Sequence, residues 1–434
     1  MINHRIYWYI LLAAVCVGDS VRAAVQPPLP IDTIAVTLEK AEEMFLANNL
    51  QLLASKYSIN AAEAAAVQAR LWSNPNISIS QNLVNQETGR WLDVTSTGNT
   101  EIAVQQLILL AGKRGKQVRV AEIGEEIAGL GFYDLLRTLK AQLRTDFYAL
   151  LYLRQTLRFY DESIPPLQHT VAAAEESYRK GSMLLSEVLR LKSLLLTLQT
   201  GRLDILNQIT SQQQDLQVIL NVPNRAHYLL PRIEGEQRIT AFILPPFEDV
   251  VARALDARPD LKMAAAVVRQ EEANLALQRA LAVPDLTVGG QWSRAGNYIP
   301  DYYAVSVSID LPLFNRNQGN IAVSENTLAA DKLTMERTRR QVEREVSDAY
   351  EKLTAIDRVW QSFDTSFPDQ YARLVENTVR NYQNRNMTVI EFTDFFESYR
   401  ASIQQYTQLE SNRSAAIEDL NYKAGADVVS VPVK

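Results

Sequence analysis

The chain has 434 residues, and its 50 acidic and 44 basic side chains give a formal net charge of −6 at pH 7. A net acidic chain lacks the positive surface that attracts phosphate backbones, so we expect no nucleic-acid partner. One cysteine and three histidines exclude a disulfide framework, a thiolate zinc site and a cysteine-histidine nucleophile pair. We therefore expect no catalytic residues, no cofactor and no resident metal ion.

Residues 1–23 have the pattern of a secretory signal peptide. A short basic start precedes an apolar run over residues 6–18, and Ala23 ends a small-residue cleavage site. The run is shorter than the roughly 20 residues that a membrane-spanning helix needs. In an alternative interpretation Cys16 becomes a lipidated N-terminus, but Val15 stands where a lipoprotein signal normally has a small residue. Either interpretation predicts export from the cytoplasm.

The chain repeats its features in the same order at an offset of 202 to 209 residues. The paired features include Pro75 with Pro284, Asp146 with Asp348, Tyr178 with Tyr382, Met183 with Met387, and Glu187 with Glu391. So many matches at a nearly constant offset predict two internal structural repeats. We expect a first repeat over residues 24–222, an irregular connecting segment over 223–246, a second repeat over 247–425 and a C-terminal tail over 426–434.

Each half contains two segments with the period of a β-strand. In YAVSVSIDL at residues 303–311, large apolar side chains occupy every odd position, and small or polar ones occupy the even positions. The four predicted strands cover residues 75–84, 97–107, 284–294 and 301–311. Each reaches the roughly 9–11 residues of a tilted transmembrane strand, and aromatic residues flank both ends. The alternation is also compatible with the edge of a soluble β-sandwich.

The segments between these strands have helical composition over unusual lengths. Residues 112–180 and 317–384 are rich in Ala, Leu, Glu, Gln and Arg, and each would extend about 100 Å as a helix. Pro165 and Pro368 occur at matching points, so we expect a kink or a change of supercoil there in both helices. Shorter helices are predicted over residues 36–48, 50–72, 184–221, 247–257, 261–282 and 389–422.

Four strands joined to such helices cannot stand alone in lipid, because an open sheet edge leaves backbone groups without partners. The sheet must close with copies of itself. Three copies of four strands give 12, an even number within the range of known barrels. We therefore predict an α+β membrane protein that forms a homotrimer. Its 12-stranded β-barrel would continue into a long α-helical coiled-coil barrel.

At this point the chain resembles the TolC-type outer-membrane efflux family over essentially its whole mature length. The motifs that carry the resemblance are NNLQL at residues 48–52, LWSNP at 71–75 and LPLF at 311–314. A further segment, QQLILLAGKRG at residues 105–115, is similar to the Gln-Pro-Ile-Glu-Leu-Gly-Gly-Lys-Arg stretch of the heavy-metal CzcC/CusC-like branch. It departs from that stretch at Leu107, Leu109 and Ala111.

The resemblance implies a passive duct whose two far helix turns dock on a periplasmic adaptor, the membrane fusion protein of an inner-membrane efflux pump. The first turn, YRKGSMLLSE at 178–187, keeps the family pattern. The second, YQNRNMTVIE at 382–391, has Arg385 where Gly is usual, so we expect Asn384 or Asn386 to take the left-handed turn conformation. The implied docking residues are Lys180, Gly181, Ser182, Met183, Ser186, Glu187, Arg385, Asn386, Met387 and Thr388.

The same resemblance implies a periplasmic gate at Tyr382, Glu391 and Asp394. Without it, each of these residues would be interpreted as a solvated helix residue. The family further implies a location in the bacterial outer membrane, contact with its lipid, and a helical barrel in the periplasm. The branch implies divalent metal cations as cargo, with drug or small-molecule efflux and type I secretion as alternatives within the family.

A competing hypothesis from another class is a soluble periplasmic coiled-coil adaptor or scaffold without a pore. Enzyme hypotheses find no support in the motifs. GKRGKQ at residues 112–117 lacks the first Gly and the Ser or Thr of a phosphate-binding loop. His169 and His227 have no His or Cys at ligand spacing, so they are interpreted as surface or packing residues.

Overall fold

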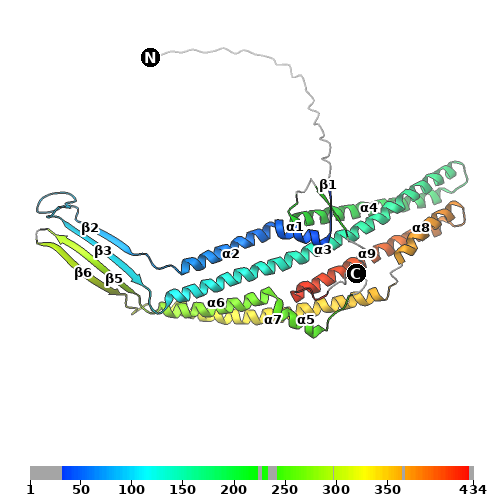
Figure 1. The fold of residues 1–434 in the computed structure, drawn as a ribbon. Coiled ribbons are helices and arrows are strands. Elements are labelled where there is room, and N and C mark those ends of the chain that lie inside the picture. The colour runs from blue at the N-terminus through cyan, green and yellow to red at the C-terminus, as the bar shows by residue number, and fades with distance from the viewer. Residues whose placement is uncertain (1–31, 223–226, 233–241, 297, 364–366, 430–434) are drawn as a thin grey trace, which may run out of the picture.

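The computed structural model describes residues 32–222, 227–232, 242–296, 298–363 and 367–429. The molecule is elongated, with a β-sheet at one end, helices along its length and two helical turns at the other end (Figure 1). The predicted signal peptide, Cys16 and the last residues of the predicted tail lie outside the described residues.

Four strands form one antiparallel sheet in the order β2, β3, β5, β6. They are β2 (Asn76–Gln81), β3 (Asn99–Ile108), β5 (Leu286–Ala295) and β6 (Ile299–Ile309). Each overlaps one of the predicted strands, and only β2 is clearly shorter than expected. The alternation of apolar and polar residues therefore located all four strands of this sheet.

The strand register collects the apolar side chains on one face of the sheet. Ile79 pairs with Ile102, Ile102 with Trp292, and Trp292 with Tyr303, so one row of large side chains crosses all four strands. The same face carries Ile77, Val104, Leu286, Val288, Val305, Val307 and Ile309. The opposite face carries Ser78, Ser80, Glu101, Gln105, Thr287, Gln291, Ser306 and Ser308. One face of the sheet is thus apolar and the other is polar.

The loop between β2 and β3 is organised around the carboxylate of Asp93. This carboxylate accepts hydrogen bonds from the Thr95 hydroxyl at 2.5 Å, the Asn85 amide at 2.8 Å and the Thr97 hydroxyl at 2.8 Å. These bonds, that of Thr95 foremost, hold the pKa of Asp93 well below its usual value. The loop therefore has a defined shape maintained by its own residues.

Two strands that the sequence did not predict join the start of the described chain to the connecting segment. They are β1 (Asp32–Val36) and β4 (His227–Pro231), which pair in parallel. Because Val36 belongs to β1, the helix predicted over residues 36–48 begins later, as α1 (Leu38–Asn48), and Thr37 caps its N-terminus. The prediction of an irregular 223–246 segment is therefore wrong for the residues of β4.

The remaining elements are helices, and their order is alike in the two halves. The first half has α1, α2 (Leu50–Ala69), α3 (Lys113–Arg179) and α4 (Leu185–Leu220). The second half has α5 (Phe247–Ala257), α6 (Pro259–Leu281), α7 (Gln318–Gln361), α8 (Phe367–Gln383) and α9 (Val389–Ala424). In each half the two sheet strands lie between the second and third of these helices.

The two long helices differ at their prolines. Helix α3 continues through Pro165 and Pro166 to Arg179, and the kink or change of supercoil at Pro165 stays a prediction. Ile164 and Leu167 are buried in the core there, and this packing stabilises the helix where hydrogen bonds are missing. The second stretch is divided into α7 and α8, and Pro368 lies in the first turn of α8, where its missing N–H costs little.

Below the sheet, four helices lie side by side in the order α2, α3, α6, α7. Ion pairs join each neighbouring pair of helices: Arg70 with Glu122, Arg269 with Glu126, and Arg279 with Glu325. Within the described part of the chain, α2 and α7 are therefore the outer helices of this layer. They continue the two outer strands of the sheet, β2 and β6.

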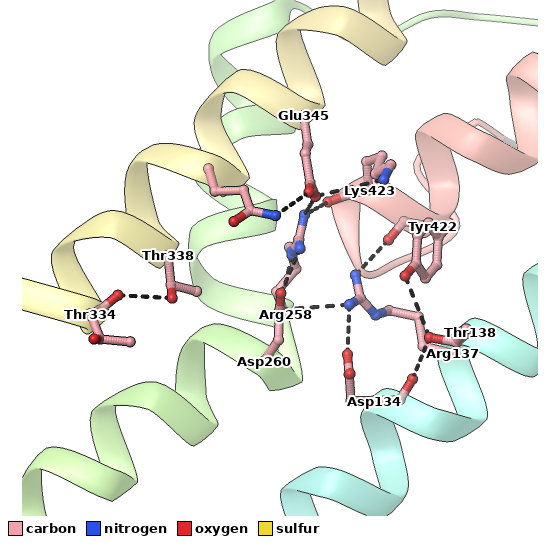
Figure 2. A network of polar contacts seen from close by, with 11 residues as sticks. Asp134, Arg137, Thr138, Arg258, Asp260, Thr334, Thr338, Glu345, Tyr422 and Lys423 are labelled. Atoms are coloured by element: carbon pink, nitrogen blue, oxygen red, sulfur yellow. Dashed lines mark hydrogen bonds and ion pairs between the residues drawn. The ribbon is translucent and has the colours of Figure 1, made fainter. Parts of the chain in front are cut away.

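An ionic cluster joins α3, α6, α7 and α9 near the middle of the molecule (Figure 2). Arg258 is only 3% exposed and contacts Asp260 at 2.6 Å and Glu345 at 2.8 Å. Burial alone would lower the pKa of Arg258, but its bonds to these two carboxylates outweigh that effect and raise it. Arg137 of α3 joins the cluster through Asp260 at 3.6 Å and Tyr422 O at 2.8 Å.

Candidate docking and gating site at the helix turns

The turn between α3 and α4 is a Schellman motif centred on Gly181. Gly181 has a φ of 74° and donates its N–H to Tyr178 O at 2.9 Å, while Ser182 N donates to Ser177 O at 3.0 Å. These two bonds satisfy carbonyl groups at the end of α3, and the positive φ favours glycine. The glycine of the first turn therefore has the conformational role that the family pattern implies.

The turn between α8 and α9 has the same hydrogen-bond pattern, but Arg385 stands at its centre. Arg385 N donates to Tyr382 O at 3.0 Å, and Asn386 N donates to Asn381 O at 2.9 Å. Arg385 itself has a φ of 62°, so the expectation that Asn384 or Asn386 takes the left-handed conformation is wrong. The two hydrogen bonds require the left-handed backbone conformation at position 385. This conformation costs about 1–2 kcal/mol for a residue that has a Cβ atom.

The helix that follows each turn begins with a glutamate that folds back on the chain. Glu391 accepts hydrogen bonds from Thr388 N at 2.8 Å and from the Thr388 hydroxyl at 2.9 Å, and its own N–H donates to that hydroxyl. The backbone bond, followed by the hydroxyl bond, lowers the pKa of Glu391. In the first turn, Glu187 accepts from Leu184 N at 3.3 Å. Both glutamates therefore have a structural role as capping residues.

A groove of about 430 Å³ separates the two turns and is lined by residues of both. It brings together seven of the implied docking and gate residues: Ser182, Met183, Glu187, Tyr382, Arg385, Met387 and Thr388. The other implied residues do not line it. Lys180 forms an ion pair with Glu176 at 3.2 Å, and Gly181, Ser186 and Asn386 are exposed.

The three implied gate residues lie close together but in different surroundings. Tyr382 is half-buried, with its ring 4.5 Å from that of Phe392, and burial followed by the charge of Glu187 raises its pKa. Glu391 and Asp394 are exposed and lie one helical turn apart on α9. The two acids therefore form one charged face above an aromatic layer.

The sequence did not single out the α3 side of the groove or the aromatic residues beneath the gate. Thr170, Ala173 and Ser177 of α3 line the groove. Their spacing of three and four residues places small side chains on one face of the helix, which is the signal that could have identified them. Phe392 and Phe396, with ring centroids 4.8 Å apart, form the buried support beneath the exposed acids.

Among the described residues, no three His, Cys, Asp or Glu side chains come together as a metal-binding group. No helix in the described part of the chain is both long and apolar enough to cross a membrane. His169 is exposed on α3, and His227 lies in β4.

Comparisons with known proteins agree with this architecture. The sequence profile of the outer membrane efflux protein family matches residues 43–222 and 250–425. The cobalt-zinc-cadmium resistance protein CzcC of Cupriavidus metallidurans is 24% identical over 286 residues, which are 66% of this chain. That match spans 65% of the length of CzcC.

Solved structures share the fold at low sequence identity. A membrane protein of Pseudomonas aeruginosa matches 89% of this chain and 92% of its own, with a TM-score of 0.73 at 17% identity. The CusC channel matches 93% of this chain and 96% of its own, with a TM-score of 0.72 at 15% identity. The resemblance inferred from the motifs is confirmed, and the profile covers most of the sequence. The chain therefore belongs to the outer membrane efflux protein family, whose members are non-enzymatic outer-membrane channels.

Proposed function

We propose that this outer-membrane efflux channel is a homotrimer that forms the exit duct of a tripartite pump for divalent metal cations. The observation that carries the proposal is the sheet, which has one apolar face and ends at two outer strands, β2 and β6. Val305 and Val307 on the apolar face are 83% and 63% exposed in the single chain. A lipid environment would cover such a face without further protein.

The outer strands support closure with further copies of the chain. In hydrocarbon, unpaired backbone groups of β2 and β6 would each cost several kcal/mol, so β6 of one copy pairs with β2 of the next. Four strands in each of three copies give 12 strands. The helices that continue from the strands then form a periplasmic barrel. In this assembly, residues 24–222 and 247–425 act as two structural repeats.

The groove between the turns supports docking of a periplasmic adaptor at the far end of the helices. Its walls combine apolar side chains, such as Met183 and Met387, with the charged side chains of Glu187 and Arg385. Flexible methionines adapt to a partner surface, while the two charges orient it. An inner-membrane efflux pump would deliver the substrate to this end of the duct.

Metal cations as cargo are supported by the CzcC relative and by the acids of the implied gate. Three copies would place three Glu391 and three Asp394 side chains around one opening, with Tyr382 beneath them. A ring of carboxylates attracts cations, whereas export of drugs or of a secreted protein has no need of it. The distinguishing measurement is the tolerance of a deletion strain to Co²⁺, Zn²⁺ and Cd²⁺ compared with its tolerance to organic drugs.

Assembly is tested by detergent extraction of outer membranes followed by electrophoresis with and without heating. A heat-labile trimer in the outer-membrane fraction supports the duct. Recovery of a soluble monomer from the periplasm would instead support the competing hypothesis of an adaptor or scaffold. Cross-linking from a cysteine at Ser186, followed by identification of the attached proteins, tests the docking assignment separately.

A further inference from the structure

Two landmarks beside the sheet relate the first repeat to the second residue by residue. Pro75, directly before β2, matches Pro284 before β5 at an offset of 209 residues. Gly112 and Asn317 precede α3 and α7, both have a left-handed conformation, and they match at an offset of 205. The offsets differ because the turn between β5 and β6 is four residues shorter than the loop between β2 and β3.

The register of the sheet agrees with both offsets. Ile77 of β2 pairs with Val104 of β3, and the offsets convert this pair into Leu286 with Ile309, which is itself an observed pair of β5 and β6. Each residue of β2 therefore has a counterpart in β5, and each residue of β3 has a counterpart in β6. A contact of β6 with the β2 of a second copy would join the same two kinds of strand as the contact of β3 with β5.

The contact of β3 with β5 therefore gives the register expected between copies. In this contact, residues 104–106 pair with residues 290–288. The two offsets convert these pairs into three pairs between copies: Ile309 with Gln81, Asp310 with Ser80, and Leu311 with Ile79.

The backbone groups on the two open edges of the sheet have the spacing that this register requires. Asn82 N donates to Asn99 O and Gly296 N donates to Gly98 O, both at 3.2 Å. Backbone groups in an antiparallel strand point alternately to either side, so the odd-numbered residues of β2 face its open edge. The same alternation, followed across β5, leaves the odd-numbered residues of β6 facing the other open edge. The register places odd-numbered residues opposite each other, so these pairs can exchange both backbone bonds.

Pro312 is compatible with this edge. As an even-numbered residue it directs its backbone toward the β5 side, so its missing N–H removes no bond to a second copy. Leu313 N donates to Leu311 O at 2.9 Å across this proline. The expected ladder between copies therefore ends at Leu311, whose carbonyl oxygen can accept a second bond.

The exposure of the side chains supports the same contact. Ile79 is 71% exposed and Leu311 is 69% exposed. Val288, the counterpart of Ile79, is half-buried because strands lie on both sides of it. Pairing with a second copy gives Ile79 the second neighbour that Val288 already has. Asp310, the one charged member of the three pairs, lies opposite the hydroxyl of Ser80.

At the junction of strands and helices, an ion pair joins the two repeats within the chain. The Lys113 side chain is 3% exposed and contacts the Asp285 carboxylate at 2.7 Å. Lys113 also donates to Val283 O at 2.6 Å, and Leu110 N donates to the Asp285 carboxylate at 2.9 Å. These bonds connect the end of β3 and the start of α3 to the start of β5.

The counterparts of this ion pair are two neutral amides. The offsets convert Lys113 into Gln318 and Asp285 into Asn76, and both amides are exposed in the single chain. The Gln318 amide donates to Phe314 O at 3.3 Å, a contact within its own turn. An amide pair supplies one donor and one acceptor without charge. Exchanging partners between the two junctions would leave Lys113 or Asp285 without its counter-charge, so the difference favours correct assembly.

We propose that the contact between copies repeats the contact between repeats, through three strand pairs and one amide contact: Ile309 with Gln81, Asp310 with Ser80, Leu311 with Ile79, and Gln318 with Asn76. The proposal rests on the trimeric channel proposed above and specifies its register. A shift by one residue would oppose the open-edge groups of one strand to the bonded groups of the other. A shift by two would move Gln318 about 7 Å away from Asn76.

Disulfide formation between copies tests the register. With Cys16 replaced by serine, Asp310→Cys is combined with Ser80→Cys, a pair without mutual backbone bonds whose Cα atoms would lie about 4.5 Å apart. Within one chain these positions lie on opposite edges of the sheet, at least about 14 Å apart across three strand spacings. A disulfide can therefore form only between copies. Mild oxidation of outer membranes should yield covalent dimers and trimers.

The matched controls move the second cysteine by two residues, to Ser78→Cys or Asn82→Cys, which keeps it on the same face of the strand. Its Cβ atom would then lie about 7–8 Å from that of position 310, so the covalent product should fall to the level of the single-cysteine variants. The largest yield at position 78 or 82 would overturn the register. A trimer that cross-links in none of the three combinations would overturn the contact of β6 with β2, whereas a wild-type protein that is not trimeric overturns the proposed function itself.

Transplanting the ion pair gives an independent readout. Gln318→Lys and Asn76→Asp each place a charge without a partner at the contact between copies, so each should lower the temperature at which the trimer dissociates. The double variant should dissociate at a higher temperature than either single variant. The control, Gln318→Lys with Ser78→Asp, moves the carboxylate about 7 Å along the strand and should show no such recovery. A double variant no more heat-resistant than its single variants would contradict the amide contact.

Discussion

An arginine scan along the apolar face of β6 gives the sharpest test of the lipid-facing assignment. Val305 lies near the middle of the strand, while Ile309 ends it. An arginine on the lipid face of a barrel costs about 2–4 kcal/mol at the bilayer midplane and about 0–1 kcal/mol near the interfaces. We therefore expect Val305→Arg to reduce assembly most, Val307→Arg less and Ile309→Arg least.

The cost of an arginine on the lipid face is multiplied in the assembled barrel, because each trimer would contain three copies of the substitution. Three arginines near the midplane cost about 6–12 kcal/mol per trimer, and about 1.4 kcal/mol already changes an equilibrium tenfold. Assembled Val305→Arg trimer should therefore fall below detection. The control is Ser306→Arg on the polar face. Ser306 pairs with Gly289, which has no side chain to obstruct a larger neighbour.

The assay is the yield of heat-labile trimer in extracted outer membranes, normalised to total protein by immunoblot. A loss graded by depth in the valine and isoleucine variants, with normal assembly of Ser306→Arg, would support a lipid-facing sheet. If Val305→Arg and Ser306→Arg assembled equally well, the two faces would not differ in environment and the barrel assignment would be refuted.

The remaining predictions concern the helix turns and the ionic cluster. Gly181→Val strains a residue with positive φ, so adaptor cross-linking and efflux should fall while the trimer persists; unchanged efflux would remove this turn from the docking surface. Arg385→Gly relieves the same left-handed conformation and should stabilise the fold by about 1 kcal/mol, seen as a higher midpoint in thermal unfolding. Glu391→Gln with Asp394→Asn should weaken cation selectivity in planar bilayers, since Gln can retain the capping bond, whereas unchanged selectivity would mean that the acids do not line the opening. Arg258→Met removes the nearest cation of two partly buried carboxylates, but Asp260 keeps Arg137 at 3.6 Å and Glu345 keeps Lys423 at 3.7 Å, so the free energy of unfolding should fall by less than the roughly 3–5 kcal/mol of an uncompensated buried charge, with denaturant titration as the measurement.

The sequence predicted the features that depend on local periodicity. The alternation in residues 303–311 and its counterparts located the strands of the large sheet, because side-chain direction in a strand changes at every residue. The long helices followed from composition and spacing in the same way. The family motifs then identified both helix turns.

The features that the sequence missed depend on contacts between distant segments. β1 and β4 have five residues each and lie almost two hundred residues apart, so neither carries a strand pattern long enough to recognise. Pro165 lies inside α3, and the burial of its neighbours Ile164 and Leu167 depends on distant segments that the sequence alone does not place. Arg385 takes the left-handed conformation because the turn's hydrogen bonds determine which residue must adopt it.

The loop held by Asp93 has a consequence for how the outermost part of the chain responds to acid. A carboxylate with a lowered pKa contributes stability above its unfolded pKa and loses that contribution only as the pH falls through the lower folded value. Its partners Asn85, Thr95 and Thr97 all lie within eight residues of it. Gln81 of β2 also donates to Asp93 O at 2.8 Å, so the loop is fixed both by its own side chains and by its attachment to the sheet. The chain therefore carries a loop whose shape should persist at a pH that protonates ordinary carboxylates.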